Sequence, residues 1–321
     1  MHVKLRSALV AGATAALLAG GAAPVAMATA SATASGAAGS AAHCDDGSSA
    51  ARVRANSKGK EPAQDPQAPA YGQIKAQPRM ANGSVHIPTV VHMLQSSTAP
   101  SSRTDAEWTA MVNAQMKVLN DSFSGAAEPA GHEAEGSDTP FRFDLASIDF
   151  VKKDAWYHVT VSSKAERDMK RALHAGSSET LNVYVGDIGD NLLGWAYFPR
   201  EISNNGRNYL DGVVMLDESM PGGTAGKYSL GDTLPHEVGH WLALHHTFQA
   251  GCSASNDFVA DTPKEAHPQF DCPVGADTCT APGADPIHNF MDYSQDSCMY
   301  LFTAGQAQRM NDAWINFRAI P

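Results

Sequence analysis

The feature that most constrains the fold is the segment HEVGHWLALHHTF, which spans residues 236–248. It follows polar residues and a proline that can start a helix, and a helix places His236 and His240 one turn apart on the same face. Two imidazole nitrogens presented in this way can bind one metal ion, and the neighbouring carboxylate of Glu237 can reach a metal-bound water without ligating the ion. The segment therefore predicts a short helix that carries part of a metal site.

A third protein ligand has to come from beyond this helix. His246 lies ten residues after His236, so a straight helix could not bring both to one ion, and the chain must turn sharply after Leu242. Ala243 stands where a glycine would allow positive φ, at a cost of about 1 kcal/mol or somewhat more. Because a structural zinc can contribute roughly 10 kcal/mol or more, we expect the turn to form and His246 to bind the metal. His245 is the alternative ligand, although it breaks the spacing.

Strand and helix patterns alternate upstream of this segment, which indicates an α/β layer with helices packed against a sheet. We expect strands at residues 85–94, 141–151, 180–188, 193–199 and 211–219, and helices at residues 104–123, 164–176 and 303–320. After Phe248 the regular patterns give way to Gly, Pro, Asp and Cys until the final helix. The ordered domain is thus expected at residues 83–321, divided into an upper part, 83–246, and an irregular lower part, 247–321.

The first residues have the layout of a secretory signal peptide. Lys4 and Arg6 precede an apolar run, and the small residues Ala26 and Ala28 then offer a cleavage site, so residues 1–28 predict export. A membrane anchor is the alternative, but the run is short and rich in Ala and Gly rather than Leu. Residues 29–82 consist of Ala, Ser, Gly, Pro and scattered charge, which is typical of a largely disordered propeptide or linker.

Charge is divided unevenly along the chain. Residues 1–80 contain eight Lys/Arg and four Asp/Glu, so that of the total net charge of −11 the remaining residues carry −15. An acidic domain argues against binding to nucleic acid, whose phosphates attract basic patches. It favours cationic partners or substrates, or it serves only to keep an exported protein soluble.

With NFMDYSQDSCMYLFTAGQ at residues 289–306, the histidine segment resembles the metzincin clan of zinc endopeptidases, specifically the pappalysin family (peptidase family M43) in its compact bacterial secreted form. The resemblance implies an α+β fold: a mixed twisted sheet with the active-site helix in an N-terminal subdomain, then a disulfide-rich, irregular C-terminal subdomain that ends in a helix. It also implies that Met291 forms the methionine turn beneath the metal. Tyr293 would help to ligate the resting metal or stabilise the tetrahedral intermediate.

The resemblance implies peptide-bond hydrolysis. One zinc ion, held by His236, His240 and His246, would polarise the scissile carbonyl and a water, and Glu237 would act as general base. The substrates would be proteins or peptides, extended along an edge strand for which Trp195 and its neighbours are the candidates. An ordinary half-buried strand is the alternative for that segment.

Five cysteines are present, of which Cys44 lies in the leader and four lie late in the chain. In an exported protein the late four indicate two disulfides with three possible connectivities, and they contain no C-x-x-C that would favour a structural zinc. The resemblance implies the pairs Cys252–Cys279 and Cys272–Cys298. The thiolate of Cys44 could occupy the open zinc position and keep a zymogen silent, or it could be an incidental free thiol.

Two further sites are expected near the metal. The loop NDFVADTP offers oxygen ligands from Asp257, Val259, Asp261 and Thr262, which would suit a structural calcium ion, although a solvated acidic loop is an equal alternative. Asp296, shortly after the methionine turn, could pair with a basic side chain that follows the cleaved bond.

Other classes of function remain open at this level. Ala243 could have displaced His246, which would leave a weak or inactive secreted zinc-binding or carbohydrate-binding module. An amidase or deacetylase with the same metal chemistry is a second rival, which the methionine turn disfavours. We predict an extracellular, monomeric zinc endopeptidase. We expect it to bind no nucleic acid and, after removal of the signal peptide, no membrane.

Overall fold

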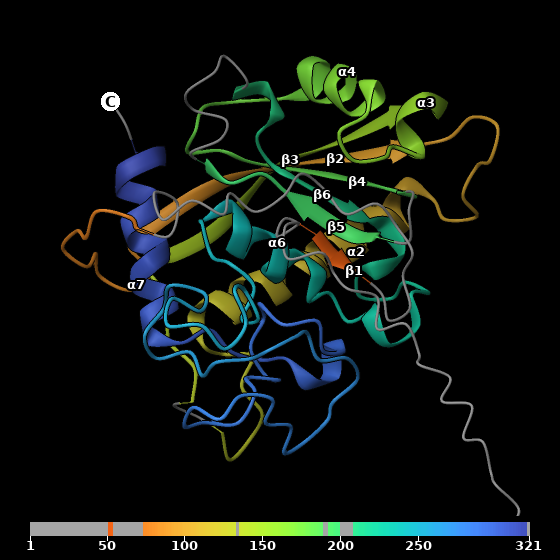
Figure 1. Cartoon of the computed structure of the whole chain (residues 1–321). Coiled ribbons are helices and arrows are strands. Elements are labelled where there is room, and N and C mark those ends of the chain that lie inside the picture. Colours follow the sequence, from red (N-terminus) through yellow and green to blue (C-terminus); the bar gives the residue numbers. More distant parts are fainter. Residues whose placement is uncertain (1–50, 54–72, 133–134, 189–191, 200–207, 320–321) are drawn as a thin grey trace, which may run out of the picture. The chain divides into compact units, whose positions relative to one another are not determined.

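The structure is a computed structural model that describes residues 51–53, 73–132, 135–188, 192–199 and 208–319 (Figure 1). The strands are β1 (Ala51–Val53), β2 (Val85–Gln95), β3 (Phe141–Lys152), β4 (Leu181–Gly186), β5 (Leu192–Ala196) and β6 (Val213–Leu216). The helices are α2 (Asp105–Ser124), α3 (Asp154–Tyr157), α4 (Lys164–Leu173), α6 (Thr233–Trp241) and α7 (Ala304–Ala313), and α7 continues as one π-helical segment, η5 (Trp314–Arg318). Short 3-10 turns occupy Asn208–Leu210, Asp217–Ser219, Gly226–Tyr228 and Asp296–Cys298.

The strands form one mixed sheet in the order β1-β5-β6-β4-β2-β3. Strand β2 runs parallel to β3 and β4, and β4 runs parallel to β6, whereas β5 is antiparallel to β6. The short leader strand β1 pairs antiparallel with β5 and covers the edge that β5 would otherwise present. The expected α+β fold with a mixed sheet is therefore confirmed.

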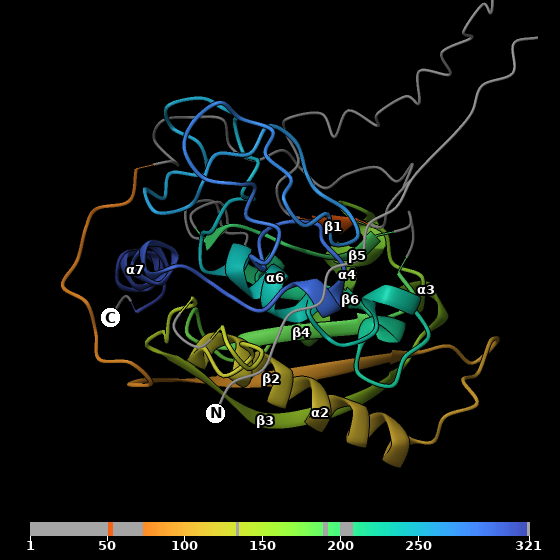
Figure 2. The ribbon, with the colours of Figure 1, turned by 90° about the horizontal axis from the view of Figure 1, so that it is seen from below.

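Helices cover both faces of the sheet (Figures 1 and 2). The long helix α2 begins at a capping box made by Thr104 and Glu107, and its buried apolar stripe packs on the face that also carries α6. On the opposite face, α3 and α4 enclose a second core that includes Trp156, Met169 and Trp195. The two apolar cores thus pack on the two faces of the sheet, and α6 belongs to the first of them.

The lower part of the domain has little regular structure between α6 and α7. Two interleaved disulfides, Cys252–Cys279 and Cys272–Cys298, cross-link these loops and are the pairs that the resemblance implies. Such links supply stability that a region poor in helices and strands cannot obtain from packing alone. Helix α7 follows these loops and begins at a second capping box, made by Thr303 and Gln306.

Residues 75–80, which composition assigns to the leader, lie along α7 (Figure 2). Polar side chains of α7 and η5 bond to the backbone of this segment. The bonds join Asp312 to Gln77 N, Asn311 to Met80 N and Pro78 O, Gln308 to Gln77 O, and Asn316 to Lys75 O. These bonds join residues 75–80 to helices more than 200 positions away in sequence, so this segment is part of the folded structure although it lies upstream of residue 83.

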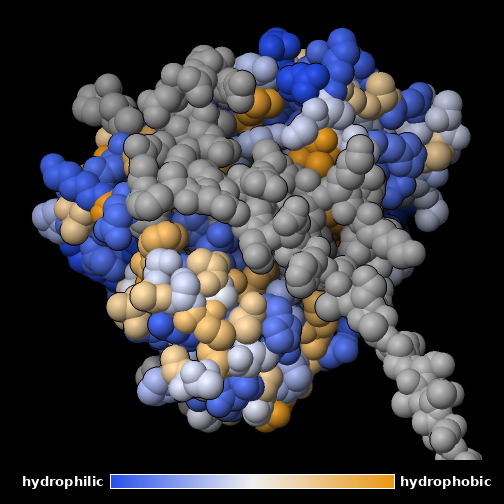
Figure 3. Space-filling model, in the orientation of Figure 1, coloured by the Kyte–Doolittle hydropathy of each residue, from blue (hydrophilic) through white to orange (hydrophobic). Residues whose placement is uncertain are grey.

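One face of the molecule shows how polar and apolar residues are distributed over the described surface. Figure 3 shows strongly hydrophilic residues over the upper part and a mixture of polar and apolar residues over the lower part. Leu230 and Val274, at 54% and 83% exposure, are the exposed large hydrophobic residues in the described ranges. No helix in these ranges is both long and apolar enough to cross a bilayer.

Candidate metal centre

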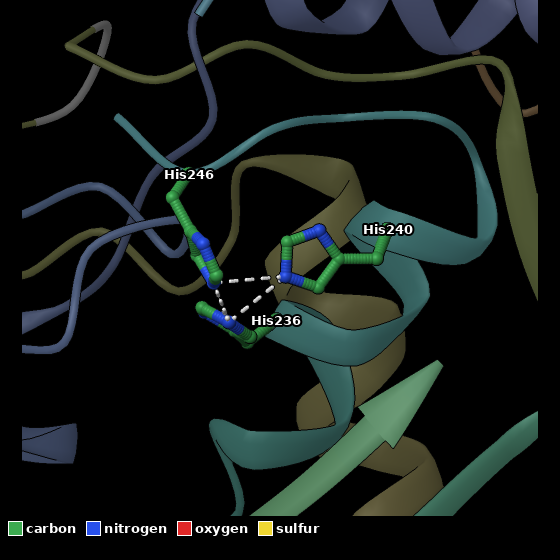
Figure 4. Close-up of side chains that lie close together, drawn as sticks. All are labelled: His236, His240 and His246. Carbon is green, nitrogen blue, oxygen red and sulfur yellow. Dashed lines mark hydrogen bonds between the residues drawn. The ribbon is translucent and has the colours of Figure 1, made fainter. Parts of the chain in front are cut away.

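Helix α6 and the turn after it bring three histidines together (Figure 4). The Nε2 atom of His236 lies 3.2 Å from those of His240 and His246, and the latter two are 3.1 Å apart. All three residues are buried. Tetrahedral zinc with bonds of about 2.0–2.1 Å holds its ligand atoms roughly 3.3 Å apart, so the three nitrogens fit such an ion.

The remaining ring nitrogens fix the tautomers. His236 Nδ1 lies 2.6 Å from the carbonyl oxygen of Phe290, and His240 Nδ1 lies 2.8 Å from that of Leu244. A carbonyl only accepts, so both Nδ1 atoms carry the proton and both Nε2 atoms present lone pairs. Converging lone pairs in a buried place repel one another unless a cation binds them, and the donor set suits zinc.

The turn after α6 forms with alanine in the left-handed region. Ala243 has φ +70°, its amide bonds to His240 O, and the amide of Leu244 bonds to Gly239 O. These two bonds are those of a Schellman motif, whose left-handed position usually belongs to glycine. The turn reverses the chain after Leu242 and brings His246 back to the other two histidines.

His245 takes a different direction from His246. Its ring lies 5.1 Å from that of Phe198 and 5.5 Å from that of Phe258, and it does not belong to the cluster of three histidines. His246 instead stacks on Phe248 with a ring separation of 4.7 Å. The structure thus selects His246 of the two candidate third ligands, and Ala243 has not displaced it.

Glu237 is buried between α6 and the sheet. A Cβ atom built on Gly194 of β5 would come within 2.9 Å of Glu237 Cγ and 3.0 Å of its Oε1. Glycine at this position therefore leaves the space that the Glu237 side chain occupies. This role of Gly194 could not be predicted from the sequence, because it depends on how β5 lies against α6.

Met291 lies directly beneath α6. A Cβ atom on Gly239 would come within 2.4 Å of the Met291 sulfur. The backbone of the same turn holds the ligands, since Phe290 O accepts from His236 and Met291 O accepts from the amide of Thr247. A glycine inside a helix costs about 1 kcal/mol relative to alanine, which is the one sequence signal that could have marked Gly239 as a packing position.

Tyr293 packs beside the metal ligands. Its ring lies 4.8 Å from that of His246 and 5.9 Å from that of His236, and the residue is buried. Phe248 and Phe270 complete an aromatic wall around it. The tyrosine ring thus contacts two of the three histidines, His236 and His246.

The two expected substrate residues are both buried. Trp195 faces the core on the side of the sheet opposite Glu237, because neighbouring residues of a strand point to opposite faces, and its indole nitrogen donates to Glu166 at 2.8 Å. The expectation that the strand around Trp195 pairs with a substrate concerns the backbone of this strand, and it stays a prediction. Asp296 accepts from the amides of Leu230 and Gly231, at 2.8 and 3.1 Å.

The expected calcium loop contains buried oxygens. Asn256 Oδ1, Asp257 Oδ2 and Thr262 Oγ1 have no hydrogen-bond partner within the part of the chain that the structure describes. Burial raises the pKa of Asp257 to about 7. Asp261 differs, since its carboxylate accepts from Thr303 Oγ1 and from the amide of Gly305 at the start of α7. Cys44 lies outside the described residues.

Comparisons with known proteins place the chain among metalloproteases. The family model of peptidase M43, described as pregnancy-associated plasma protein-A, matches residues 167–314. An extracellular metalloprotease of Neurospora crassa is 38% identical over 243 residues, which cover 74% of this chain and 78% of that protein. Extracellular metalloprotease 1 of Coccidioides posadasii is 40% identical over 237 residues, 73% of this chain and 79% of that protein. The expectation of a bacterial form has no support from these curated relatives, which are fungal.

Solved structures with the same fold include two forms of one protein. A mutant of Tannerella forsythia promirolysin superposes with a TM-score of 0.62 at 28% identity, covering 76% of this chain and 84% of that chain. Mature mirolysin in complex with a cleaved peptide gives a TM-score of 0.60 at 28% identity, covering 75% of this chain and all of that chain (100%). These similarities extend well beyond the histidine segment.

Proposed function

Since this chain belongs to the pappalysin family, peptidase family M43, and is an extracellular zinc metalloendopeptidase, we propose that Glu237 is its general base. The observation that carries the proposal is the triangle of Nε2 atoms 3.1–3.2 Å apart, with Glu237 buried next to two of these ligands on α6. Zinc bound by the three histidines supplies a Lewis acid that polarises the scissile carbonyl and lowers the pKa of a bound water toward about 7.

The protein's own groups then move the protons. Glu237 takes the proton of the attacking water and passes it to the leaving amine. The hydroxyl of Tyr293 donates to the oxygen on which negative charge develops, which its position beside His246 supports. The carbonyl oxygens of Phe290 and Leu244 accept from Nδ1 of His236 and His240, which leaves the two Nε2 atoms as the lone-pair donors that the metal would bind.

The experiment uses the secreted protein. Metal analysis should give one zinc per chain, and cleavage of casein should stop with a chelator and return with zinc. Glu237→Gln should keep the zinc and lose cleavage by about a hundredfold or more. His246→Asn should lose zinc, whereas the matched variant His245→Asn should retain it. A Glu237→Gln variant that still cleaves at the rate of the native protein would remove Glu237 from the mechanism, and full zinc with no cleavage by the native protein would favour a binding module.

The substrate is proposed to pair with β5. This strand is the sheet edge nearest Glu237, and in the structure the leader strand β1 occupies it in antiparallel pairing. A leader that occupies the substrate edge suits a zymogen, in which Cys44 would block the zinc. Cys44→Ala should then make the unprocessed chain active against peptides, and an inert Cys44→Ala proform would remove the cysteine from the proposal.

Asp296 is proposed to select a basic residue after the cleaved bond. Its carboxylate is buried and accepts from two backbone amides, and a carboxylate can pair bidentately with an arginine. A peptide library should show arginine or lysine at that position, and Asp296→Asn should abolish the preference while leaving cleavage of other peptides. A dominance of apolar residues there would refute the assignment.

Calcium is proposed in the loop after the ligands. The buried oxygens of Asp257 and Thr262, with the carbonyl of Val259, form an oxygen-rich set that suits this ion. Removal of calcium should lower the melting temperature and Asp257→Asn should abolish that difference. Asp261 bonds to the start of α7 and could also ligate the ion. If it ligates the ion, Asp261→Asn should weaken calcium binding; if it only bonds to α7, calcium binding should not change.

A further inference from the structure

The zinc helix ends in a turn that an alanine has to make. Ala243 adopts φ +70° between the ligands His240 and His246, in a region that L side chains rarely enter. The position of His246 depends on this turn, because the turn reverses the chain. Contacts from outside the turn can therefore add to its stability and to the placement of His246.

The C-terminal helix supplies the contacts. Arg309 of α7 donates from Nε to the carbonyl oxygen of Ala243 at 2.8 Å, in a buried environment. The methyl group of Ala243 packs in a small apolar cluster with Phe198 and Ala313, the latter also from α7. A charge-assisted bond to a carbonyl at a helix C-terminus is stabilising both because the carbonyl would otherwise lack a partner and because a cation suits the negative end of the helix.

A second arginine provides a natural comparison. Arg318 of η5 donates to the carbonyl of Trp241, at 3.0 Å from Nε and 2.7 Å from an Nη, and it pairs with Asp211 at 2.8 Å. It therefore caps the helix itself, two residues before Ala243. Arg309 alone of these two bonds to the left-handed residue.

We propose that Arg309 is a positioning residue for the zinc ligand His246, acting through the carbonyl of Ala243. It holds the turn in the left-handed conformation and so compensates for the alanine. The inference rests on the proposed function only in that His246 binds zinc. It predicts that Arg309 matters most when residue 243 carries a Cβ.

The test is a double-mutant cycle between Arg309→Met and Ala243→Gly in the full chain. The readouts are the zinc Kd, measured by competition with a chelator of known affinity, the melting temperature of the zinc-free protein, and kcat and KM. Arg309→Met should weaken zinc binding about tenfold or more, because it removes a charge-assisted buried hydrogen bond. In the Ala243→Gly background the same change should weaken it by less than about threefold, because glycine makes the turn without help.

Arg318→Met serves as the matched control. It should destabilise the zinc-free protein to the same extent in both backgrounds, because its partner is not residue 243. If Arg309→Met does not fold, Arg309→Lys replaces it, and the same coupling to Ala243→Gly is expected in smaller measure. Equal effects of the Arg309 variant in both backgrounds, or an equal rescue of Arg318→Met, would overturn the proposal.

The outcome can be separated from a failure of the proposed function. If the native chain binds zinc and loses cleavage with Glu237→Gln, the function stands whatever the cycle gives. If the native chain binds no zinc, the proposed function fails. The cycle in the zinc-free protein still tests whether Arg309 stabilises the turn, since Ala243→Gly should then rescue the loss of melting temperature caused by Arg309→Met. The absence of this rescue would overturn the proposed role of Arg309 as well.

Discussion

Two glycines provide the space around the metal ligands. A Cβ on Gly239 would meet the sulfur of Met291 at 2.4 Å, and a Cβ on Gly194 would meet Glu237 Cγ at 2.9 Å. Both distances are shorter than packed atoms tolerate, so any larger residue must displace a neighbour. The two neighbours differ in role, since Met291 supports the zinc helix whereas Glu237 is the proposed base.

Gly194→Ala is therefore expected to separate zinc binding from proton transfer. The three atoms nearest to the added methyl group would be Glu237 Cγ and Oε1 and the carbonyl oxygen of Val214, at 2.9, 3.0 and 3.0 Å, so the variant would push the Glu237 side chain. We expect one zinc per chain and a fall in kcat of about tenfold to a hundredfold, because a small displacement of a catalytic group costs this much. Metal analysis and steady-state kinetics on peptides measure both quantities.

Gly186→Ala on β4 is the matched control for crowding. A Cβ there would come within 3.0 Å of Tyr157 O and 3.2 Å of Leu94 Cβ, far in sequence from Glu237. It should lower the melting temperature and leave kcat per folded molecule unchanged. An equal fall in kcat in both variants would show that the effect of Gly194→Ala comes from general strain in the sheet.

Asp217 gives the stability a dependence on pH. Burial, together with the charge of Glu218, raises the pKa of Asp217 to about 6 in the folded protein, above its ordinary value of 3.8. Ionisation in the folded state is thus unfavourable, so the stability present below about pH 4 is lost as pH rises through 6. Asp217→Asn, which stays neutral, should gain about 2–3 kcal/mol relative to the native protein between pH 4 and pH 7. Urea unfolding of the two proteins across this range measures the difference, and a difference that does not change with pH would refute the prediction.

At the scale of elements, local patterns predicted the strands and helices well. The apolar periodicity predicted α2, with Thr104 as its cap, and a final helix at residues 303–320, because these signals lie within a few residues of one another. The pairing of β1 with β5 and the contacts of Arg309 could not be predicted, since they join segments that are distant in sequence. The same reason explains why His236, His240 and His246 were found while Gly194 was missed.

The leader segment at residues 75–80 tests where the folded domain begins. Its backbone is bonded by side chains of α7 and η5, and Ile74 lies against the cluster that contains Ala243. A chain that starts at Ser84 should therefore melt several degrees below one that starts at Gln73, because it leaves Asp312 and Asn311 without these partners. Melting curves of the two zinc-loaded proteins give the result. Equal melting temperatures would show that the segment adds nothing to the domain.

At the scale of the whole molecule, two described parts of the leader contact the rest of the structure. The leader pairs with β5 through β1 and binds α7 through residues 75–80. The two attachments lie on elements that flank α6, which suits a leader that controls access to the metal.

The two disulfides of the lower part are expected to differ in effect. Their sequence separations of 27 and 26 residues predict similar contributions, about 3.5 kcal/mol each from loop entropy. The Cys272–Cys298 bond, however, closes the segment that carries Phe290 and Met291, where Gln295 N also bonds to Asp271 O. The Cys252–Cys279 bond holds loops that provide none of the bonds to the ligand imidazoles described above.

Replacing each pair by serines should therefore lower the melting temperature similarly but change zinc binding differently. Cys272→Ser with Cys298→Ser should loosen the turn that accepts the Nδ1 proton of His236, and so weaken zinc binding by about tenfold, because losing the outer partner of a ligand costs tenfold to a hundredfold. Cys252→Ser with Cys279→Ser should leave the zinc Kd within about threefold of the native value. Chelator competition on both proteins measures this, and an equal loss in the two would mean that the lower part supports the site only through its overall stability.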